Sequence, residues 1–318
     1  MSRTAGLVVS WNDTLRAAWD ESHAGAAASY QQDWAYGAAL NAMSPGVQVL
    51  RAAVRRADGS LAALAQIAAR PFAMAGRFAL CTHGPIWIGG ISADEKREAC
   101  RRLKSSLPQR WPRLLVFTPD EAANEGLKGL SRVMTGDATV LVDLTKDEDA
   151  LRAAMDQGWR NRLSKAERSD LVVQKAGVKP SQYRWLLEAE AKQRARRGYR
   201  AMPVDMTERW QDAKADGARG DKAAGLAVYR ADLKRDAAAG MLFLIHGSRA
   251  TYHVGWTSDE GRANAAHNLL LWTAMRDLKG RGVAVLDLGG VNTQSGAGIA
   301  RFKLETGGAV LQRAGAFV

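Results

Sequence analysis

The last part of the chain, residues 240–318, alternates apolar runs with glycine-rich turns. Residues 241–245 and 250–256 are short runs rich in apolar and β-branched residues joined by His246-Gly247-Ser248, which predicts two strands and a tight turn. Residues 264–279 are apolar at helical spacing and end at glycines, and residues 283–288 form a continuous apolar run typical of a buried parallel strand. This order of antiparallel strands, helix and parallel strand predicts an α/β fold with a mixed sheet.

Several short motifs follow one another in this segment. They are Y-x-x-G at 252–255, L-L-L-W at 269–272, a helix ended by glycine, L-D-L-G-G at 286–290 and R-F-K-x-x-x-G-G at 301–308. Their order resembles the C-terminal domain of the FemABX family, whose domains have the fold of GNAT acyltransferases. Phe302 and Lys303, in this register after L-D-L-G-G, are the most specific part of the resemblance. It implies an enzyme that moves an amino acid from aminoacyl-tRNA onto an amine, typically of a peptidoglycan precursor.

The first half of the chain shows the same kind of element order. We expect a strand at 7–10, a helix at 13–22, a hairpin of 47–56 and 61–70, a strand at 78–88, a helix at 93–106 and a strand at 113–118. The chain is therefore predicted to be an α/β protein of two tandem GNAT-like (acyl-CoA N-acyltransferase-like) domains with mixed sheets.

The predicted domain limits follow from this repetition. The first domain, on the acceptor side, is expected to span residues 1–137, and the second, on the donor side with the catalytic lysine, residues 138–306. The resemblance implies that the C-terminal strand returns to the first domain, so that residues 307–318 complete it.

The composition is that of a globular protein with a strong positive charge. Of the 318 residues, 47% are hydrophobic and 25% are charged, and the formal net charge of +12 favours a polyanionic partner. Because no run of about 18 apolar residues and no export signal is found, we expect no stable membrane insertion and a cytoplasmic location. Cys81 and Cys100 are far apart in sequence, which predicts reduced thiols rather than a redox or metal pair.

Lys303 is the predicted catalytic residue. Aminolysis of an ester passes through a tetrahedral oxyanion, which a fixed cation stabilises by roughly 3–4 kcal/mol. The resemblance implies that Lys303 meets this charge and that Phe302 contributes its backbone and walls the end of the tRNA. The five histidines, at positions 23, 83, 246, 253 and 267, show neither triad-like nor metal-like spacing, so the sequence predicts no general base and no metal site.

Further residues are predicted to contact substrates: Tyr252 and Trp256 in the second strand of the C-terminal hairpin, Gln32 and Trp34 in a segment that resembles the entry of the family's first domain, and Tyr199. Residues 82–88, T-H-G-P-I-W-I, resemble a strand end of that domain. Leu80 and Ile88 stand where the family has a tyrosine and an aspartate. The acceptor and the transferred amino acid are left open.

Two basic clusters are predicted to bind phosphates of tRNA. One helix, at 159–168, buries Trp159 and Leu163 and presents Arg160, Arg162, Lys165 and Arg168. The second cluster, at 192–200, has five cations and no acid, and includes Arg194, Arg196 and Arg197. Arginine suits bidentate phosphate contact, and two clusters in one domain of a basic protein favour phosphate binding.

Acyl-CoA is the alternative donor. GNAT enzymes hold its pyrophosphate on backbone N–H groups at a glycine-rich helix start, whereas residues 258–267, S-D-E-G-R-A-N-A-A-H, contain one glycine and two acids. We therefore predict an aminoacyltransferase that uses aminoacyl-tRNA as co-substrate, an amine-bearing acceptor and no cofactor. An N-acyltransferase that uses acyl-CoA and a non-catalytic RNA-binding protein on the same fold are the two alternatives.

Overall fold

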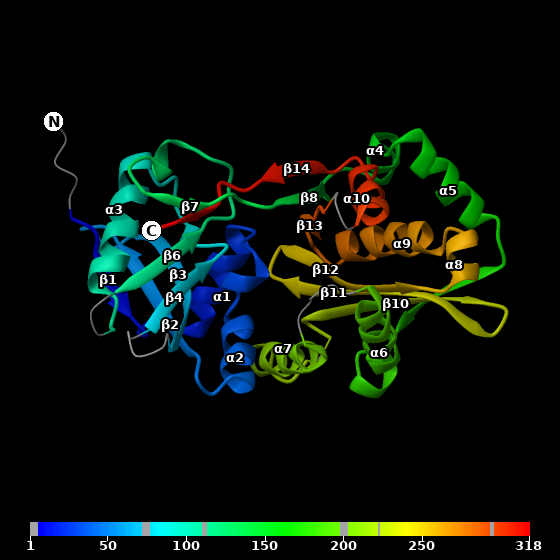
Figure 1. The fold of residues 1–318 in the computed structure, drawn as a ribbon, viewed down its shortest axis with the longest axis horizontal. Helices are drawn as coiled ribbons and strands as arrows, with labels where there is room; N and C mark the ends of the chain where they lie inside the picture. Colours follow the sequence, from blue (N-terminus) through cyan, green and yellow to red (C-terminus); the bar gives the residue numbers. More distant parts are fainter. Residues whose placement is uncertain (1–5, 72–76, 110–112, 198–202, 222, 293–295) are drawn as a thin grey trace. The chain divides into compact units, whose positions relative to one another are not determined.

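A computed structural model gives the fold, and it describes residues 6–71, 77–109, 113–197, 203–221, 223–292 and 296–318 (Figure 1). The chain divides into two compact units: Met1–Asp137 with Leu311–Val318 form unit 1, and Ala138–Val310 form unit 2. Each unit contains a mixed sheet and helices, which confirms the predicted fold class. The division falls after Val310, later than the predicted limit at residue 306.

Unit 1 is built on an eight-stranded sheet in the order β1-β2-β3-β4-β6-β15-β7, with β5 paired to β3. The strands are β1 Val8–Trp11, β2 Gln48–Arg55, β3 Leu61–Pro71, β4 Arg77–Thr82, β5 Ile86–Trp87, β6 Leu114–Thr118, β7 Arg132–Met134 and β15 Ala316–Phe317. β15 pairs antiparallel with β6, placing Phe317 opposite Phe117, and also with β7. The predicted return of the C-terminal strand to the first unit is therefore confirmed.

The helices of unit 1 are α1 Arg16–Gly25, α2 Trp34–Met43 and α3 Ala93–Ser106, with 3₁₀ turns at Tyr30–Gln32 and Glu125–Leu127. α3 begins with a capping box, in which Ser92 and Glu95 exchange side-chain and backbone hydrogen bonds. Cys81 and Cys100 are free and buried in the unit 1 core, and burial raises the pKa of both thiols. The thiols are therefore protonated, and Cys100 and Cys81 pack as small apolar side chains.

Unit 2 is built on a seven-stranded sheet in the order β14-β8-β13-β12-β11-β10-β9. The strands are β8 Ala138–Asp143, β9 Leu171–Ala176, β10 Leu226–Leu233, β11 Asp236–His246, β12 Arg249–Thr257, β13 Val285–Gly290 and β14 Ala309–Gln312. The helices are α4 Glu148–Ala154, α5 Gln157–Glu167, α6 Pro180–Arg197, α7 Val204–Gly217, α8 Asp259–Ala263, α9 Ala266–Gly280 and α10 Ala297–Leu304.

The core of unit 2 lies between the sheet and helix α9. Leu271, Met275 and Leu278 of α9 are fully buried against Met241 and Phe243 of β11, together with Trp159 and Leu163 of α5. Helix α6 covers the opposite face, as Figure 1 shows, where a Cβ on Gly240 would meet the rings and methyl groups of Trp185 and Leu186. The sheet therefore has an apolar helix layer on each face.

Three predicted elements differ from the structure. The predicted strand at 78–88 is interrupted between β4 and β5, because His83 takes a positive φ of 51° and a cis peptide bond joins Gly84 to Pro85. Helix α1 begins at Arg16 rather than at residue 13, because Asn12 has a positive φ and its side chain accepts from Arg51 N. Helix α9 begins at Ala266, after Ala265 in the left-handed region.

No helix in the described ranges is both long enough and apolar enough to cross a lipid bilayer.

Candidate functional site

Strands β12 and β13 are paired at one end of unit 2 and separate at the other. Parallel pairing joins Arg249 to Val285 and continues to Thr251 opposite Asp287. Both strands continue beyond this pairing. The register of β12 against β11 is irregular, and so is the register of β13 against β8 between Asp287 and Gly290. Bulges bend strands and change the direction of side chains. We therefore consider the residues after Thr251 in β12 and after Asp287 in β13 as a candidate site. The predicted residues Tyr252 and Trp256 are among them.

Lys303 points toward the end of β13. Its Nζ donates to Gly290 O at 2.8 Å and lies 6.0 Å from the centroid of the Tyr252 ring. The residue is 8% exposed, and burial lowers the pKa of the Lys303 ammonium to about 8, although the negative charge of Asp287 acts in the opposite direction. At neutral pH the lysine is therefore a protonated, partly desolvated cation held on a backbone carbonyl, as an oxyanion site requires.

Helix α10 is fixed by contacts on both sides of Lys303. The indole Nε1 of fully buried Trp159 donates to Phe302 O at 3.2 Å, and Thr306 Oγ1 donates to Lys303 O at 2.6 Å. Gly307 has a φ of 78°, and a Cβ there would lie 2.3 Å from Ala154 O. The spacing F-K-x-x-x-G-G thus reflects a helix that ends in a tight turn against α4.

Glu305, just after α10, binds two arginines. Its carboxylate accepts from Arg301 Nε at 2.5 Å and from Arg162 of α5, and its backbone oxygen accepts from Asp156 N at 3.0 Å. Glu305 is 8% exposed, so these bonds compensate the burial of its charge. The pair joins α10 to α5, and Arg162 therefore has a structural partner in addition to its predicted role with phosphate.

Aromatic side chains lie beside the lysine. The Phe302 ring centroid is 5.9 Å from that of Trp159 and 6.1 Å from that of His267. Because a carbonyl only accepts, His267 Nε2 carries the proton that it donates to Trp256 O at 3.0 Å. Burial lowers the pKa of His267 to about 4, so the ring is neutral at neutral pH. His267 thus links the Trp256 backbone to the Phe302 ring, whereas the Trp256 ring packs against Trp185 of α6, with 6.1 Å between the ring centroids.

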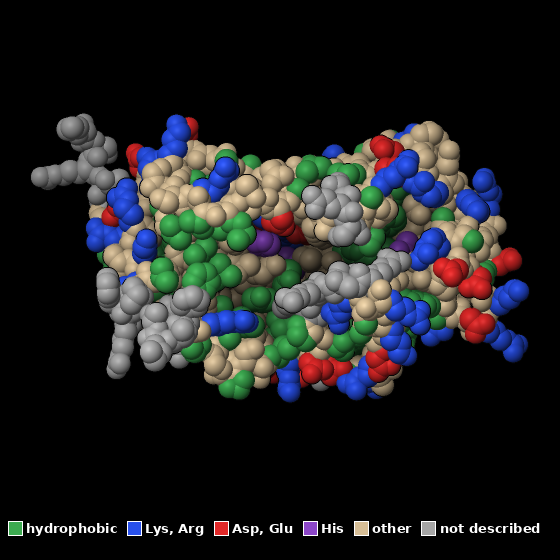
Figure 2. Space-filling model, in the orientation of Figure 1, with side chains coloured by type: hydrophobic (Ala, Val, Ile, Leu, Met, Phe, Trp, Pro, Cys, Tyr) green, Lys and Arg blue, Asp and Glu red, His purple; other side chains and the backbone are tan. Residues whose placement is uncertain are grey.

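The basic residues of α5 are largely occupied by protein partners. Arg160 donates to Ala153 O at 3.0 Å and also to Met155 O, so it caps the end of α4. Lys165 Nζ donates to Ala263 O at 2.8 Å, whereas Arg168 is exposed. The Arg160 guanidinium therefore stabilises the helix end, and its predicted contact with a tRNA phosphate stays a prediction. Figure 2 shows acidic side chains among the Lys and Arg side chains of this face.

The second predicted basic cluster lies at the end of α6. Arg194 Nε lies 4.0 Å from Glu190 Oε2 of the same helix, and Arg196 is exposed. The side chain of Arg197, and Tyr199 as a whole, lie outside the described residues. Within the described part of this cluster, Arg196 and Lys192 are exposed to solvent and available to an anionic ligand.

Gln32 and Trp34 belong to unit 1. Gln32 is fully buried: its Nε2 donates to Thr82 O at 2.7 Å and to Gln66 O at 3.1 Å, and its Oε1 accepts from Gln66 N at 2.8 Å. Gln32 therefore has a structural role, because its amide is already bonded, and the predicted substrate contact at Gln32 stays a prediction. Trp34 is half-buried, with the guanidinium of Arg51 3.7 Å from its ring centroid.

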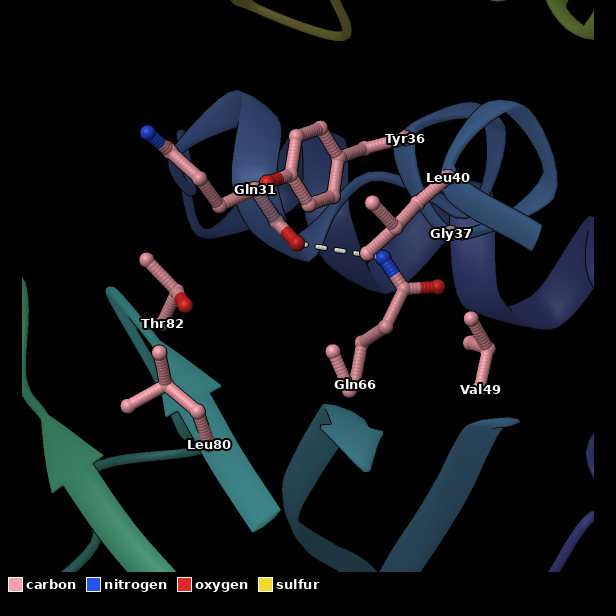
Figure 3. Close-up of a pocket in the computed structure, with 9 residues that line it drawn as sticks. Gln31, Tyr36, Gly37, Leu40, Val49, Gln66, Leu80 and Thr82 are labelled. Atoms are coloured by element: carbon pink, nitrogen blue, oxygen red, sulfur yellow. Dashed lines mark hydrogen bonds between the residues drawn. The ribbon is translucent and has the colours of Figure 1, made fainter. Parts of the chain in front are cut away.

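A small pocket lies beside this segment, between α2 and the sheet of unit 1 (Figure 3). Its lining is apolar with a few uncharged polar groups: Gln31, Tyr36, Gly37, Leu40, Val49, Gln66, Ala68, Leu80 and Thr82. The Gln66 side chain points toward Gln31, and its amide donates to Gln31 O at 3.1 Å. Leu80, which stands at the family's tyrosine position, lines this pocket, and none of the described residues that line it is charged.

Sequence reasoning missed several residues that build the site. Asp287, Arg249 and Thr139 form a buried polar cluster beside Lys303, and Glu305 fixes its helix. The signal for Asp287 was present: an acid inside a continuous apolar strand needs a buried partner. The described residues contain no group of three or more His, Cys, Asp or Glu side chains arranged to hold a metal ion.

Comparison with known proteins agrees with the fold. Residues 153–304 match the acetyltransferase (GNAT) domain family. Comparison by sequence with curated proteins finds no match. Among solved structures, the chain is similar to FemX, with a TM-score of 0.79 and 14% identity over 97% of this chain and 96% of that chain.

Two further solved structures show the same similarity. One is a conserved protein of unknown function from Bacteroides thetaiotaomicron, with a TM-score of 0.58 and 12% identity over 98% of each chain. The other is the C-terminal domain (DUF2156) of a putative lysylphosphatidylglycerol synthetase from Agrobacterium fabrum, with a TM-score of 0.51 and 15% identity over 95% of this chain and 92% of that chain. The chain has a FemABX-like tandem GNAT fold, and the GNAT match with this fold supports an acyltransferase.

Proposed function

We propose that this chain, with its FemABX-like tandem GNAT fold, is an aminoacyltransferase that moves an amino acid from aminoacyl-tRNA onto a primary amine. The amine nitrogen attacks the ester carbonyl, the bond between that carbonyl and the ribose oxygen breaks, and an amide forms. The proton lost by the amine balances the alkoxide left on the ribose. The acceptor is a peptidoglycan precursor or another amine-bearing small molecule or peptide.

The observation that carries this proposal is the placement of Lys303. Its ammonium is buried, bonded to Gly290 O at 2.8 Å, and held by a helix whose end is fixed through Trp159 and Thr306. A cation that is already desolvated and oriented stabilises a developing oxyanion without reorganisation, which is the largest single contribution in many acyl transfers. Lys303 would therefore act in the transition state rather than in binding the ester.

Aminoacyl-tRNA is favoured as the donor by the charge of the protein. The formal net charge is +12, and unit 2 presents exposed cations, such as Arg168 and Arg196, outside its internal ion pairs. Phosphate neutralisation by such residues supplies most of the affinity of proteins for nucleic acids. Phe302 would offer a flat apolar surface to the terminal base or to the amino-acid side chain, whereas the Trp256 ring packs against Trp185 of α6.

Acyl-CoA is disfavoured by the structure of the segment after β12. The glycine there, Gly261, is packed so that a Cβ would lie 2.1 Å from Ala238 O, and its amide is bonded to Ser258 Oγ at 3.0 Å. Asp259 and Glu260 stand in the first turn of α8 and would repel a pyrophosphate. The residues present therefore do not fit the phosphate cradle that this donor needs.

A donor assay tests the proposal. The full chain is incubated with total tRNA charged with labelled amino acids and with a panel of primary amines, and products are identified by mass. We expect a labelled amide that disappears when the charged tRNA is first treated with RNase. A matched reaction with acetyl-CoA should yield no amide.

Two results would assign the alternatives. An acylated amine formed from acetyl-CoA and insensitive to RNase would establish the acyl-CoA enzyme. Tight tRNA binding without turnover from either donor, unchanged in Lys303→Ala, would instead indicate a non-catalytic RNA-binding protein.

A further inference from the structure

Asp287 is a buried carboxylate at the end of β13 and accepts hydrogen bonds from three directions. Its Oδ1 accepts from Thr139 Oγ1 at 2.5 Å and from Gly289 N at 2.8 Å, and its Oδ2 accepts from Arg249 Nη2 at 2.5 Å. Asp287 is 5% exposed and Arg249 3%. Two of the three donors lie on neighbouring strands, so the carboxylate joins β8, β13 and β12 at one point.

The bond to Gly289 holds a bulge. Asp287 lies opposite Leu141 of β8, whereas Gly290 lies opposite Thr139, so β13 contains an extra residue between these pairs. Gly289 has a φ of 75°, in the region that favours glycine. Asp287 accepts from the Gly289 amide inside this bulge. It also accepts from Thr139, which lies opposite Gly290, the residue after the bulge. The Asp287 carboxylate therefore fixes the shape of the bulge.

The bulge also sets the position of the carbonyl oxygen that accepts the hydrogen bond from Lys303. The Gly290 carbonyl that follows it receives the Lys303 ammonium at 2.8 Å. A Cβ at Gly289 would lie 3.6 Å from Lys303 Nζ, so the turn passes directly beside the ammonium. A change at Asp287 would therefore reach Lys303 through the backbone of Gly289 and Gly290, without any contact between Asp287 and a substrate.

We propose that Asp287 is a positioning residue for Lys303: it fixes the Gly289 bulge, so that the Gly290 carbonyl meets the ammonium, and it sets a buried negative charge facing that ammonium. The catalytic meaning of this arrangement rests on the proposed function, but the arrangement itself concerns only the lysine. It also assigns a purpose to the L-D-L-G-G motif, in which the acid and both glycines take part.

The other charged and titratable groups around Lys303 do not perform this role. On β12, Arg249 pairs with Asp287, and burial lowers the pKa of His253 to about 4. On α9, His267 is likewise neutral at neutral pH, and on α10 Arg301 pairs with Glu305. Among the described residues, Asp287 is the acid whose charge raises the pKa of Lys303, against the larger lowering by burial.

The test measures the protonation of Lys303 without any substrate. The full chain is labelled with trace acetic anhydride over a range of pH, and the extent of acetylation at Lys303 is read by peptide mass spectrometry against a free-amine standard. Wild type should titrate at a pKa of about 8. In Asp287→Asn the titration should move to lower pH by about one unit or more, the size typical of losing an opposite charge.

Two further variants keep the test decisive. Asp120→Asn is the matched control, since Asp120 of unit 1 also pairs with a buried arginine, Arg313, at 2.7 Å. It should lower stability without moving the Lys303 titration. Asp287→Asn removes the carboxylate that pairs with buried Arg249. If this variant does not fold, Asp287→Asn combined with Arg249→Gln removes both charges and should move the titration in the same direction but by less, because the loss of Arg249 removes a positive charge that opposes protonation of Lys303.

An unchanged Lys303 titration in a folded Asp287 variant would overturn the proposal. So would an equal shift in Asp120→Asn, because a general loss of stability would then explain it. Neither result depends on the donor or the acceptor, so failure of the proposed transfer reaction would be seen separately, in the donor assay.

Discussion

The Tyr252 hydroxyl occupies the space of the side chain that Gly255 lacks: a Cβ on Gly255 would lie 1.7 Å from Tyr252 Oη. In a regular strand, residues at this spacing face opposite sides of the sheet. The irregular register of β12 between Val254 and Tyr252, opposite Leu242 and Phe243, brings the two to the same side. The Y-x-x-G motif therefore describes a tyrosine laid along its own strand, with its ring 6.0 Å from Lys303 Nζ.

Replacement of Gly255 should displace Tyr252. Gly255→Ala forces the tyrosine or the strand to move, and such overpacking typically costs about 1–3 kcal/mol. We expect a lower melting temperature and lower kcat in the transfer assay. Gly298→Ala in α10, where nothing lies within 4 Å of the new Cβ, is the matched control and should be neutral or stabilising. If Gly255→Ala melts like wild type, the tyrosine does not occupy this space.

Loss of the Glu305 carboxylate should release α10 from α5. Glu305→Gln weakens the bonds to Arg301 and Arg162, and because both arginines are well exposed we expect a loss of only about 1–2 kcal/mol in denaturant unfolding. The control is Glu125→Gln, whose partner Lys128 and own side chain are both 69% exposed. It should change stability by less than about 0.5 kcal/mol. Equal effects of the two changes would argue against an anchoring role for Glu305.

The pH dependence of transfer should report Lys303. Burial lowers its pKa to about 8, so the ammonium loses its proton at a lower pH than an ordinary lysine. The protonated form stabilises the oxyanion; kcat/KM should therefore have a descending limb near pH 8. In Lys303→Arg the residual activity should lack this limb, because a guanidinium stays charged. A limb that persists in this variant must come from another group.

The salt dependence of tRNA binding should separate exposed cations from those with structural partners. Each neutralised phosphate contributes roughly 0.7–0.9 to the slope of log affinity against log salt. Arg168→Gln and Arg196→Gln should each reduce this slope by about that amount. Arg101→Gln in α3, whose side chain is 65% exposed and pairs with Glu98, is the control and should leave the slope unchanged. The assignment of phosphate contacts fails if all three variants share one slope.

The order of elements in unit 2 could be predicted because each element has a strong local pattern. The hairpin of β11 and β12, helix α9 and strand β13 all form where apolar periodicity and glycine turns indicate them. The interruption of the strand after Thr82 could not be predicted from the sequence, because it depends on a positive φ at His83 and on a cis Gly84–Pro85 bond. Apolar periodicity carries no information about either.

The roles of polar side chains were harder to predict than the fold. Helical periodicity places Arg160 on the exposed side of α5, but it cannot show that the guanidinium reaches the last carbonyls of α4. Gln32 sits in a polar stretch of sequence and yet is fully buried, since its partners come from strands far along the chain. Such partners are set by tertiary contacts, so a pattern within one segment does not reveal them.

Turnover of Lys303→Ala tests the central claim most directly. Because the ammonium would meet charge that exists only in the transition state, its loss should lower kcat by about a hundred- to a thousandfold with little change in KM. The variant should remain folded, which circular dichroism and tRNA affinity verify, and Lys128→Ala, an exposed lysine of unit 1, should turn over like wild type. Near-normal kcat in folded Lys303→Ala would contradict the account.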